Sequence, residues 1–184
     1  MRSYLAHAAA KGYAKRTLAR KLATLRSFYR YFVREGRMAK NPMSAIRSPK
    51  LEKKLPNFLT EKDVERLLSF KVDGPTGYRD RAILETLYST GCRVSELVAL
   101  DEKDVDTIGG VIRVLGKGRK ERLCPMGSRA LAAIRDYLEA RQGDKGLATR
   151  RGPLFLNHSP HARGSRLTAR SIRRILSQRM EEMT

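Results

Sequence analysis

Apolar side chains repeat at the helical period in the first part of the chain. Between residues 17 and 34 they follow one another at spacings of four, three, four and three positions: Leu18, Leu22, Leu25, Tyr29 and Phe32. This spacing places them on one face of an amphipathic helix. We therefore predict a helix over 17–34, preceded by a shorter helix whose start is missing at Met1.

The periodic pattern stops after Gly36. The stretch NPMSAIRSPKLEKKLPNFLT contains three prolines within 15 residues and a run of cations. A long helix is excluded there, because proline lacks the backbone N–H that a helix interior needs. The sequence therefore predicts a helical domain over 1–46, an extended linker over 47–59 and a second domain over 60–184.

The second domain opens with two helix signals. Thr60 is a suitable N-cap and Asp63 stands three residues later, as in a capping box. A second amphipathic helix is predicted over 77–90, ended by Gly91. Its inward residues are Ile83, Leu84, Leu87 and Tyr88. A short helix follows in the stretch RVSELVAL.

A small β-structure comes next. Residues 111–115 and 120–124 alternate like strands and are joined by a glycine-containing turn, so they predict an antiparallel hairpin that Pro125 ends. A helix from Ser128, a short buried segment PLFLN and a basic helix capped by Thr168 complete the pattern. The predicted fold class is mainly α with a small antiparallel β-sheet.

The charge balance indicates a polyanionic partner. Lys and Arg number 39 against 19 Asp and Glu, a net charge of +20, which favours nucleic acid or an anionic membrane surface. No apolar run approaches the roughly 20 residues that span a bilayer, and no secretory signal is apparent. Cys92 and Cys124 show no pairing pattern, and the histidines have no zinc-finger spacing. We expect a cytoplasmic, nucleoid-associated protein without a metal or cofactor.

Cations cluster away from the apolar stripe of the first long helix. Between Lys15 and Arg34 there is no acidic residue, so this surface is either a solvated face or a face that meets DNA phosphates in a major groove. The residues predicted to contact DNA are Lys15, Arg16, Arg20, Lys21, Thr24 and Arg30, with Arg119, Lys120 and Arg122 from the hairpin.

Two further cations occupy positions that suit phosphate chemistry. Arg93 stands where a helix opens, and Lys117 lies between Gly116 and Gly118 in the hairpin turn. Taken alone, Arg93 is typical of a structural partner for Glu96, and Lys117 is typical of a simple turn. Together they suit a single phosphate, because a guanidinium at a helix N-terminus binds two oxygens and a lysine nearby can deliver a proton.

The segments around these two residues resemble the tyrosine site-specific recombinases of the phage integrase family, in particular the Xer branch. The resemblance rests on TGCRVSEL and GKGRKER, whose Arg93 and Lys117 are 24 residues apart, and extends over nearly the whole chain. It implies a partial helical, SAM-like core-binding domain followed by the N-terminal portion of a catalytic domain.

The resemblance also implies roles and partners. Arg93 would neutralise the scissile phosphate, Lys117 would be the general acid for the leaving 5′-oxygen, and Glu96 would support the site. In this family a tyrosine attacks DNA, forms a 3′-phosphotyrosyl link and frees a 5′-hydroxyl that rejoins a partner strand, without a metal or a nucleotide cofactor. The implied partners are double-stranded DNA and recombinase protomers, a tetramer on two DNA sites, with an FtsK-like translocase left open.

The chain departs from the family pattern near its end. The family has a His-x-x-Arg motif and a nucleophilic tyrosine downstream, whereas none of His7, His158 and His161 has an arginine three residues later, and the last tyrosine is Tyr137. We therefore expect a fragment, truncated at both ends, that binds DNA without cleaving it. Its parent would perform recombination or integration, including chromosome dimer resolution.

Two other functional classes remain open. A non-catalytic basic module that binds DNA or RNA fits the composition equally well, although such a module has no need of the pair formed by Arg93 and Lys117. A type IB topoisomerase shares the chemistry, but the linker and hairpin sequences favour the Xer branch.

Overall fold

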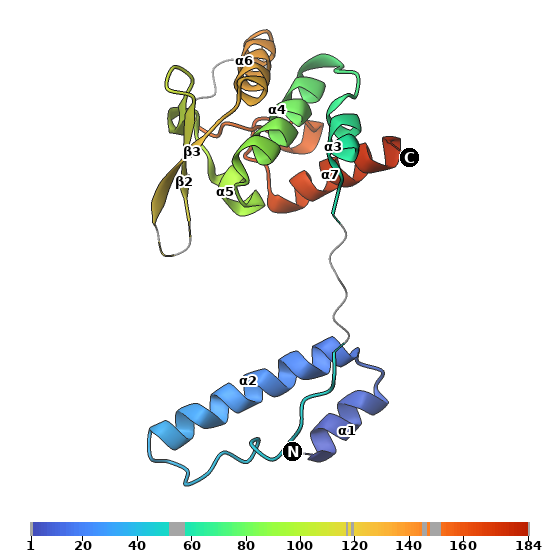
Figure 1. Cartoon of the computed structure of the whole chain (residues 1–184), viewed down its shortest axis with the longest axis vertical. Helices are drawn as coiled ribbons and strands as arrows, with labels where there is room; N and C mark the ends of the chain where they lie inside the picture. Colours follow the sequence, from blue (N-terminus) through green and yellow to red (C-terminus); the bar gives the residue numbers. More distant parts are fainter. Residues whose placement is uncertain are drawn as a thin grey trace. The chain divides into compact units, whose positions relative to one another are not determined.

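The computed structural model describes residues 2–51, 58–116, 118, 120–144, 147 and 152–183. The chain forms two compact units, Met1–Asn57 and Phe58–Thr184, and each is described by itself (Figure 1). The first unit is helical, and the second combines helices with a small antiparallel sheet. The predicted fold class is confirmed.

In the first unit, α1 (Arg2–Ala10) packs against α2 (Lys15–Arg34). Leu22 is fully buried and the other members of the predicted apolar stripe are half-buried, so the stripe forms the inner face of α2. The helix begins two residues before the predicted start. Because burial of one face stabilises such a helix more than its propensity does, α2 forms without a side-chain N-cap.

Arg26 holds the segment after α2 against that helix. Its guanidinium donates to the Met43 carbonyl at 3.4 Å, to the Ser48 hydroxyl at 2.7 Å and to the Ile46 carbonyl. Met43 is fully buried as a result of this packing. Residues 52–57 of the predicted linker lie outside the described residues, and the assignment of the two domains stays a prediction.

The second unit begins with a capped helix, as predicted. The Asp63 N–H donates to the Thr60 hydroxyl at 3.2 Å, and the Thr60 N–H donates to the Asp63 carboxylate at 2.9 Å. Thr168 and Ser171 form the equivalent box before the last helix. The helices are α3 (Glu61–Leu68), α4 (Gly74–Thr90), α5 (Val94–Ala99), α6 (Ser128–Gln142) and α7 (Ala169–Glu182), with short 3₁₀ turns η1 (Glu102–Asp104) and η3 (Pro160–Ala162).

The sheet has the strand order β1-β2-β3 and is antiparallel throughout. Its strands are β1 (Val105–Asp106), β2 (Val111–Leu115) and β3 (Glu121–Pro125). The hairpin prediction is confirmed with a shift of one residue in β3, because Pro125 pairs with Val111 as the last residue of the strand. Leu115 pairs with Glu121, so the connection comprises residues 116–120.

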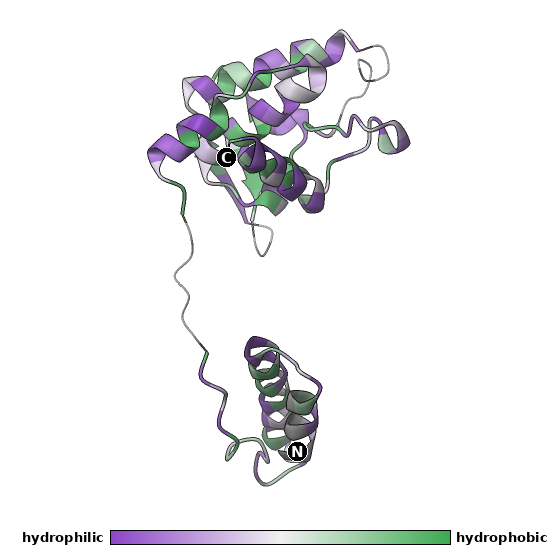
Figure 2. Cartoon of the chain, turned by 90° about the vertical axis from the view of Figure 1, so that its right-hand side faces the viewer, coloured by the Kyte–Doolittle hydropathy of each residue, from purple (hydrophilic) through white to green (hydrophobic). Residues whose placement is uncertain are grey.

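The core of the second unit lies between α4, α6 and the sheet, where the hydrophobic residues gather (Figure 2). Ile83 and Leu84 are buried as predicted, and Leu87 is partly buried. Tyr88 was predicted to face inward, and this prediction is wrong, since its side chain is 60% exposed. Leu87, the residue before it, is the one that packs against the core in this turn. No helix in the described part of the chain is long and apolar enough to cross a membrane.

Candidate functional site

Arg93 lies at the start of α5, directly after a sharp turn. Gly91 ends α4 with φ 59°, a left-handed conformation that glycine adopts without a steric penalty. Two residues later Arg93 is the N-cap of α5. Its side chain is 70% exposed, so the guanidinium is presented to solvent at a helix N-terminus.

Glu96 is the buried partner of Arg93. It stands three residues after the N-cap and is only 4% exposed. Its Oε2 accepts the Arg93 backbone N–H at 2.8 Å, and its Oε1 accepts the Arg93 Nη1 at 2.9 Å. The carboxylate therefore fixes both the backbone and the side chain of Arg93.

Arg122 binds the same carboxylate from β3. Its Nη1 donates to Glu96 Oε1 at 3.0 Å and its Nη2 to Glu96 Oε2 at 2.7 Å, a bidentate pair. The sequence predicted Arg122 as a DNA contact and missed this pairing. A signal was available, because Arg122 and the buried Cys124 are two residues apart and so share one face of the strand.

The hairpin turn starts at this ion cluster. A Cβ at Gly116 would lie 3.2 Å from Arg122 Nη1 and 3.6 Å from Glu96 Oε1, and the Gly116 N–H donates to the Lys120 carbonyl at 2.8 Å. Arg93 and Glu96 line one hollow of about 340 Å³ together with Ser95, Leu115 and Gly116. Lys117 and Arg119 lie outside the described residues.

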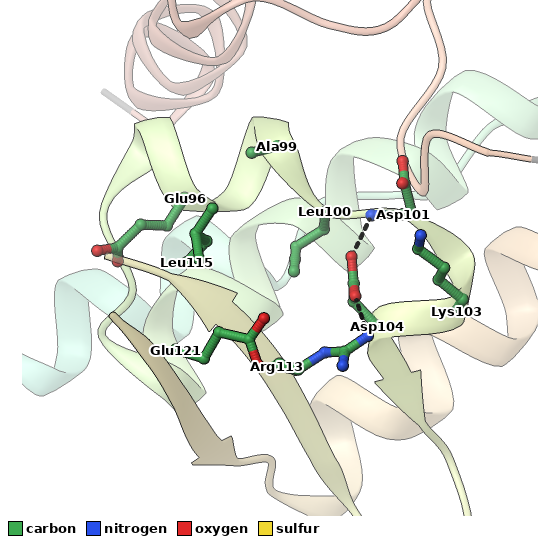
Figure 3. Close-up of a pocket in the computed structure, with 9 residues that line it drawn as sticks. All are labelled: Glu96, Ala99, Leu100, Asp101, Lys103, Asp104, Arg113, Leu115 and Glu121. Carbon is green, nitrogen blue, oxygen red and sulfur yellow. Dashed lines mark hydrogen bonds and ion pairs between the residues drawn. The ribbon is translucent and has the colours of Figure 1, made fainter. Parts of the chain in front are cut away.

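A second hollow of about 400 Å³, also lined by Glu96, lies between α5, η1 and β2 (Figure 3). Two of its polar side chains form an ion pair. Arg113 pairs with Asp104 at 2.9 Å, and the Asp101 N–H donates to the other oxygen of Asp104 at 3.0 Å. Among the described residues, no three His, Cys, Asp or Glu side chains form a group that could hold a metal ion.

Glu96 and Arg122 shift each other's pKa. The Arg122 guanidinium, followed by the Arg93 backbone N–H, lowers the pKa of Glu96 from 4.5 to about 2. The same contact with Glu96 raises the pKa of Arg122. Burial raises the pKa of the neighbouring Cys92 thiol. Glu96 is thus an anion and Arg122 a cation across the physiological range.

The lowered pKa of Glu96 predicts a pH-dependent contribution to stability. A carboxylate whose pKa falls on folding stabilises the native state above its unfolded pKa, and loses this effect as pH drops through its folded pKa. We expect the melting temperature of Glu96→Gln to be lower than that of the native chain at pH 7. The difference between the two melting temperatures should narrow as the pH falls from about 5 to 2. Thermal unfolding over this pH range measures it.

Glu65→Gln is the matched control, because Glu65 is an exposed carboxylate on α3. Its melting temperature should track that of the native chain at every pH. A gap between Glu96→Gln and the native chain that stays constant from pH 7 to pH 2 would contradict the role given to the Glu96 charge.

The site retains unused hydrogen-bond donors. An arginine side chain carries five N–H donors, and one terminal nitrogen of Arg93 binds Glu96. Within the described residues the rest of that guanidinium makes no hydrogen bond, so it can bind a ligand with two oxygens. An anion in this hollow would meet Arg93, the N-terminus of α5 and the start of the hairpin turn together.

Tyr137, the last tyrosine of the sequence, does not belong to this site. It is fully buried on α6, its hydroxyl accepts the Leu156 N–H at 3.1 Å, and burial raises its pKa. Its ring stacks on Phe155 with centroids 5.8 Å apart. These contacts make Tyr137 a core residue.

The residues of α2 that were predicted to contact DNA lie mostly on its outer face. Arg16, Arg20, Thr24 and Arg30 fall on the face opposite the apolar stripe, and all four are exposed. Lys21 differs, because it is half-buried near the edge of the stripe. Its Nζ lies 3.3 Å from the Tyr4 hydroxyl and 5.2 Å from the centre of the Tyr13 ring. The remaining predicted DNA contacts described by the structure, Lys15 and Lys120, are exposed.

The sequence is similar to curated tyrosine recombinases over its whole length. The tyrosine recombinase XerC of Pelotomaculum thermopropionicum is 47% identical, with an alignment that covers 100% of this chain and 60% of that protein. XerC of Pelobacter propionicus is 45% identical and is covered over 58% of its length, with 100% of this chain aligned. The chain spans about three-fifths of the length of these curated relatives.

Solved structures share the fold. The crystal structure of XerA recombinase matches with 26% identity and a TM-score of 0.59, over 96% of this chain and 57% of that one. The Tn1549 transposon integrase in complex with circular intermediate DNA matches with 23% identity and a TM-score of 0.70, over 98% of this chain and 63% of that one.

Two family profiles match the sequence itself. "Phage integrase, N-terminal SAM-like domain" matches residues 1–36, and "Phage integrase family" matches residues 57–183, which is more than half of the chain. With the XerC relatives, these matches confirm the resemblance to the Xer-branch tyrosine recombinases. The chain therefore belongs to the phage integrase family.

Proposed function

We propose that the intact protein is a tyrosine recombinase that breaks and rejoins DNA strands, and that this chain contributes DNA binding and part of the catalytic site. One observation carries the proposal. Arg93 is held by the buried Glu96 and offers most of its guanidinium to a hollow where the hairpin turn begins. This arrangement suits a single DNA phosphate.

Each residue of the site has a role in this proposal. Arg93 binds two non-bridging oxygens of the scissile phosphate and offsets the negative charge that grows in the transition state. Lys117, which follows Gly116 in the turn, donates a proton to the leaving 5′-oxygen. Glu96 orients Arg93 and does not contact DNA. No metal is required by this assignment, because the two cations stabilise the charge.

The nucleophile is assigned to a tyrosine outside these 184 residues. The hollow around Arg93 is lined by no tyrosine of the described residues, and Tyr137 is a core residue. The tyrosine would form a 3′-phosphotyrosyl link as the 5′-oxygen leaves, and attack by a 5′-hydroxyl would reverse the step. The energy of the broken bond is kept in the covalent link, so no nucleotide cofactor is needed.

The DNA partner is supported by the charge of the chain and by the outer face of α2. A net charge of +20 suits a polyanion, and α2 presents exposed arginines without an acidic residue between them. We assign double-stranded DNA as the substrate, with further recombinase protomers as partners on paired DNA sites. The first unit then serves as the core-binding domain and the second as part of the catalytic domain.

The chain itself can be tested for binding. We expect affinity for duplex DNA to fall steeply with salt, because each phosphate contact contributes about −0.9 to the slope of log K against log salt. The combined variant Arg16→Gln, Arg20→Gln and Arg30→Gln should make this slope shallower by about 2 to 3. Fluorescence anisotropy at several salt concentrations measures it.

A control variant removes the same charge elsewhere. Lys62→Gln, Lys103→Gln and Arg129→Gln change three exposed cations outside α2, and the slope should shift by less than about 1. Equal shifts in both combined variants would mean that α2 has no special contact with DNA.

Strand cleavage tests the function. The full-length product of the gene that encodes this chain, incubated with a duplex that carries a nick near its recombination site, should form a covalent protein–DNA complex that survives denaturation. Loss of the complex after protease digestion, together with a 3′-blocked DNA end, supports the tyrosine mechanism. DNA binding without any covalent complex would favour the non-catalytic binding module.

A further inference from the structure

We propose that Arg122 is a positioning residue of this site: it occupies both oxygens of Glu96 and thereby leaves Arg93 free to bind the phosphate. The inference rests on the proposed function and assigns Arg122 a role other than the predicted contact with DNA. Arg122 acts through Glu96 and Arg93, without touching the reacting atoms.

The first step of the argument is the saturation of Glu96. Its two oxygens accept four hydrogen bonds, two on each oxygen, from the backbone and Nη1 of Arg93 and from Nη1 and Nη2 of Arg122. A carboxylate has about four acceptor sites, and Glu96 is only 4% exposed. No acceptor position is left over for a second bond from the Arg93 side chain.

The second step concerns the guanidinium of Arg93. Because Arg122 provides the bidentate partner, Arg93 makes one side-chain bond to Glu96 and remains 70% exposed. Without Arg122, the carboxylate would be a buried anion with two vacant acceptor positions, which is costly. Among the described residues, the Arg93 side chain, which already binds Oε1, is a cation that can fill them. It would turn from the hollow toward Glu96 and lose the orientation that a phosphate needs.

The third step concerns the hairpin. Arg122 pairs with Val114 across the sheet, and its Nη1 lies against Gly116, where an added Cβ would be only 3.2 Å away. The contact with Glu96 therefore connects β3 to the N-terminus of α5. It holds Gly116, the residue at which the turn begins, beside Arg93.

The neighbouring strand offers a matched control. Arg113 lies on β2 in the same hairpin and pairs with one carboxylate, Asp104, at 2.9 Å. Its side chain is 45% exposed, against 41% for Arg122. A change of either arginine to glutamine removes the same charge from the same hairpin. Of these two arginines, only Arg122 binds Glu96.

The experiment compares Arg122→Gln, Arg122→Lys and Arg113→Gln in the full-length gene product. We expect Arg122→Gln to reduce single-turnover cleavage at saturating DNA about 100-fold, since small misplacements of catalytic groups cost that much. DNA affinity should stay within about twofold of native, since an exposed contact that reaches no phosphate adds nothing to the salt-dependent term. Arg122→Lys keeps the charge and should recover part of the rate, and Arg113→Gln should cleave like the native protein.

A double variant separates positioning from a general loss of structure. In a Glu96→Gln background, the further change Arg122→Gln should slow cleavage by less than about threefold, because both act through one contact. Independent, multiplying effects would overturn the proposal. The proposal would also be overturned if Arg122→Gln cleaved at the native rate but bound DNA more weakly, with the slope of log K against log salt reduced by about one. That result would identify Arg122 as a phosphate contact.

A structural readout does not depend on activity. In a crystal structure of the Arg122→Gln chain, the Arg93 guanidinium should bind both oxygens of Glu96. An Arg93 side chain that keeps its single bond to Oε1 would overturn the inference. If the native protein fails to cleave DNA, the proposed function fails, while this structural comparison still decides the role of Arg122.

Discussion

Replacement of Arg93 by alanine is expected to reduce strand cleavage by the full-length gene product at least about 1,000-fold. Loss of one preorganised donor to a charged transition state costs about 100- to 1,000-fold, and Arg93 supplies two donors and a full charge. Binding to duplex DNA should weaken less than about tenfold, because the cations of α2 and many other contacts remain. Single-turnover cleavage and equilibrium binding, measured on the same DNA, separate the two effects.

Conservative and matched variants define the contribution of the guanidinium. Arg93→Lys keeps the charge but not the planar fork, so cleavage should fall between the native rate and that of Arg93→Ala. Arg135→Ala is the control, since Arg135 is an exposed arginine on α6 that donates to the Thr107 carbonyl and does not line the hollow. Full cleavage by Arg93→Ala would remove Arg93 from the site.

Replacement of Lys117 by alanine is expected to slow cleavage about 100- to 10,000-fold, the usual range for a general acid. Affinity for DNA should stay near native. The physical reason is that an alkoxide leaves poorly without a proton, whereas one lost phosphate contact would alter mainly binding. The measurement is cleavage of a duplex whose scissile 5′-oxygen is replaced by sulfur.

The sulfur substrate isolates the proton transfer. A thiol has a pKa of about 8.5, far below that of an alcohol, so a thiolate leaves without a general acid. Lys117→Ala should cleave the sulfur duplex at close to the native rate, while Arg93→Ala should stay slow on it. A Lys117→Ala protein that is equally slow on both duplexes would make Lys117 an ordinary phosphate contact.

Local sequence signals predicted most of the secondary structure. The apolar stripe of α2 and the capping residue Thr60 act over three or four residues, so their effects can be read along the chain. The hairpin followed from alternation and from glycines in the turn, with an error of one residue at Pro125. Arg93 was likewise placed correctly at a helix start, because Gly91 ends the preceding helix.

Features that depend on distant neighbours escaped prediction. Tyr88 was assigned to the inner face of α4 from its spacing, but its side chain is 60% exposed, whereas Leu87 beside it packs against the core. Arg122 and Glu96 are 26 residues apart, and their contact depends on how the hairpin packs against α5. Lys21 was grouped with the outward cations, although Tyr4 and Tyr13 lie beside its ammonium. Charge and spacing alone do not reveal such tertiary partners.

The Glu96 cluster gives the small sheet a function beyond packing. α5 alone would present Arg93, and β3 alone would present Arg122, but the shared buried carboxylate brings both to one place. The hairpin turn is thereby attached to the N-terminus of a helix, where anions are favoured.

A crystal structure of this chain bound to duplex DNA tests the central claim most directly. We predict that the Arg93 guanidinium and the Lys117 ammonium both lie within about 3.2 Å of oxygens of one backbone phosphate, the reach of a hydrogen bond. Glu96 should remain beneath them, bound by Arg122. Two cations on different phosphates, or a Lys117 side chain directed away from the hollow around Arg93, would contradict the account.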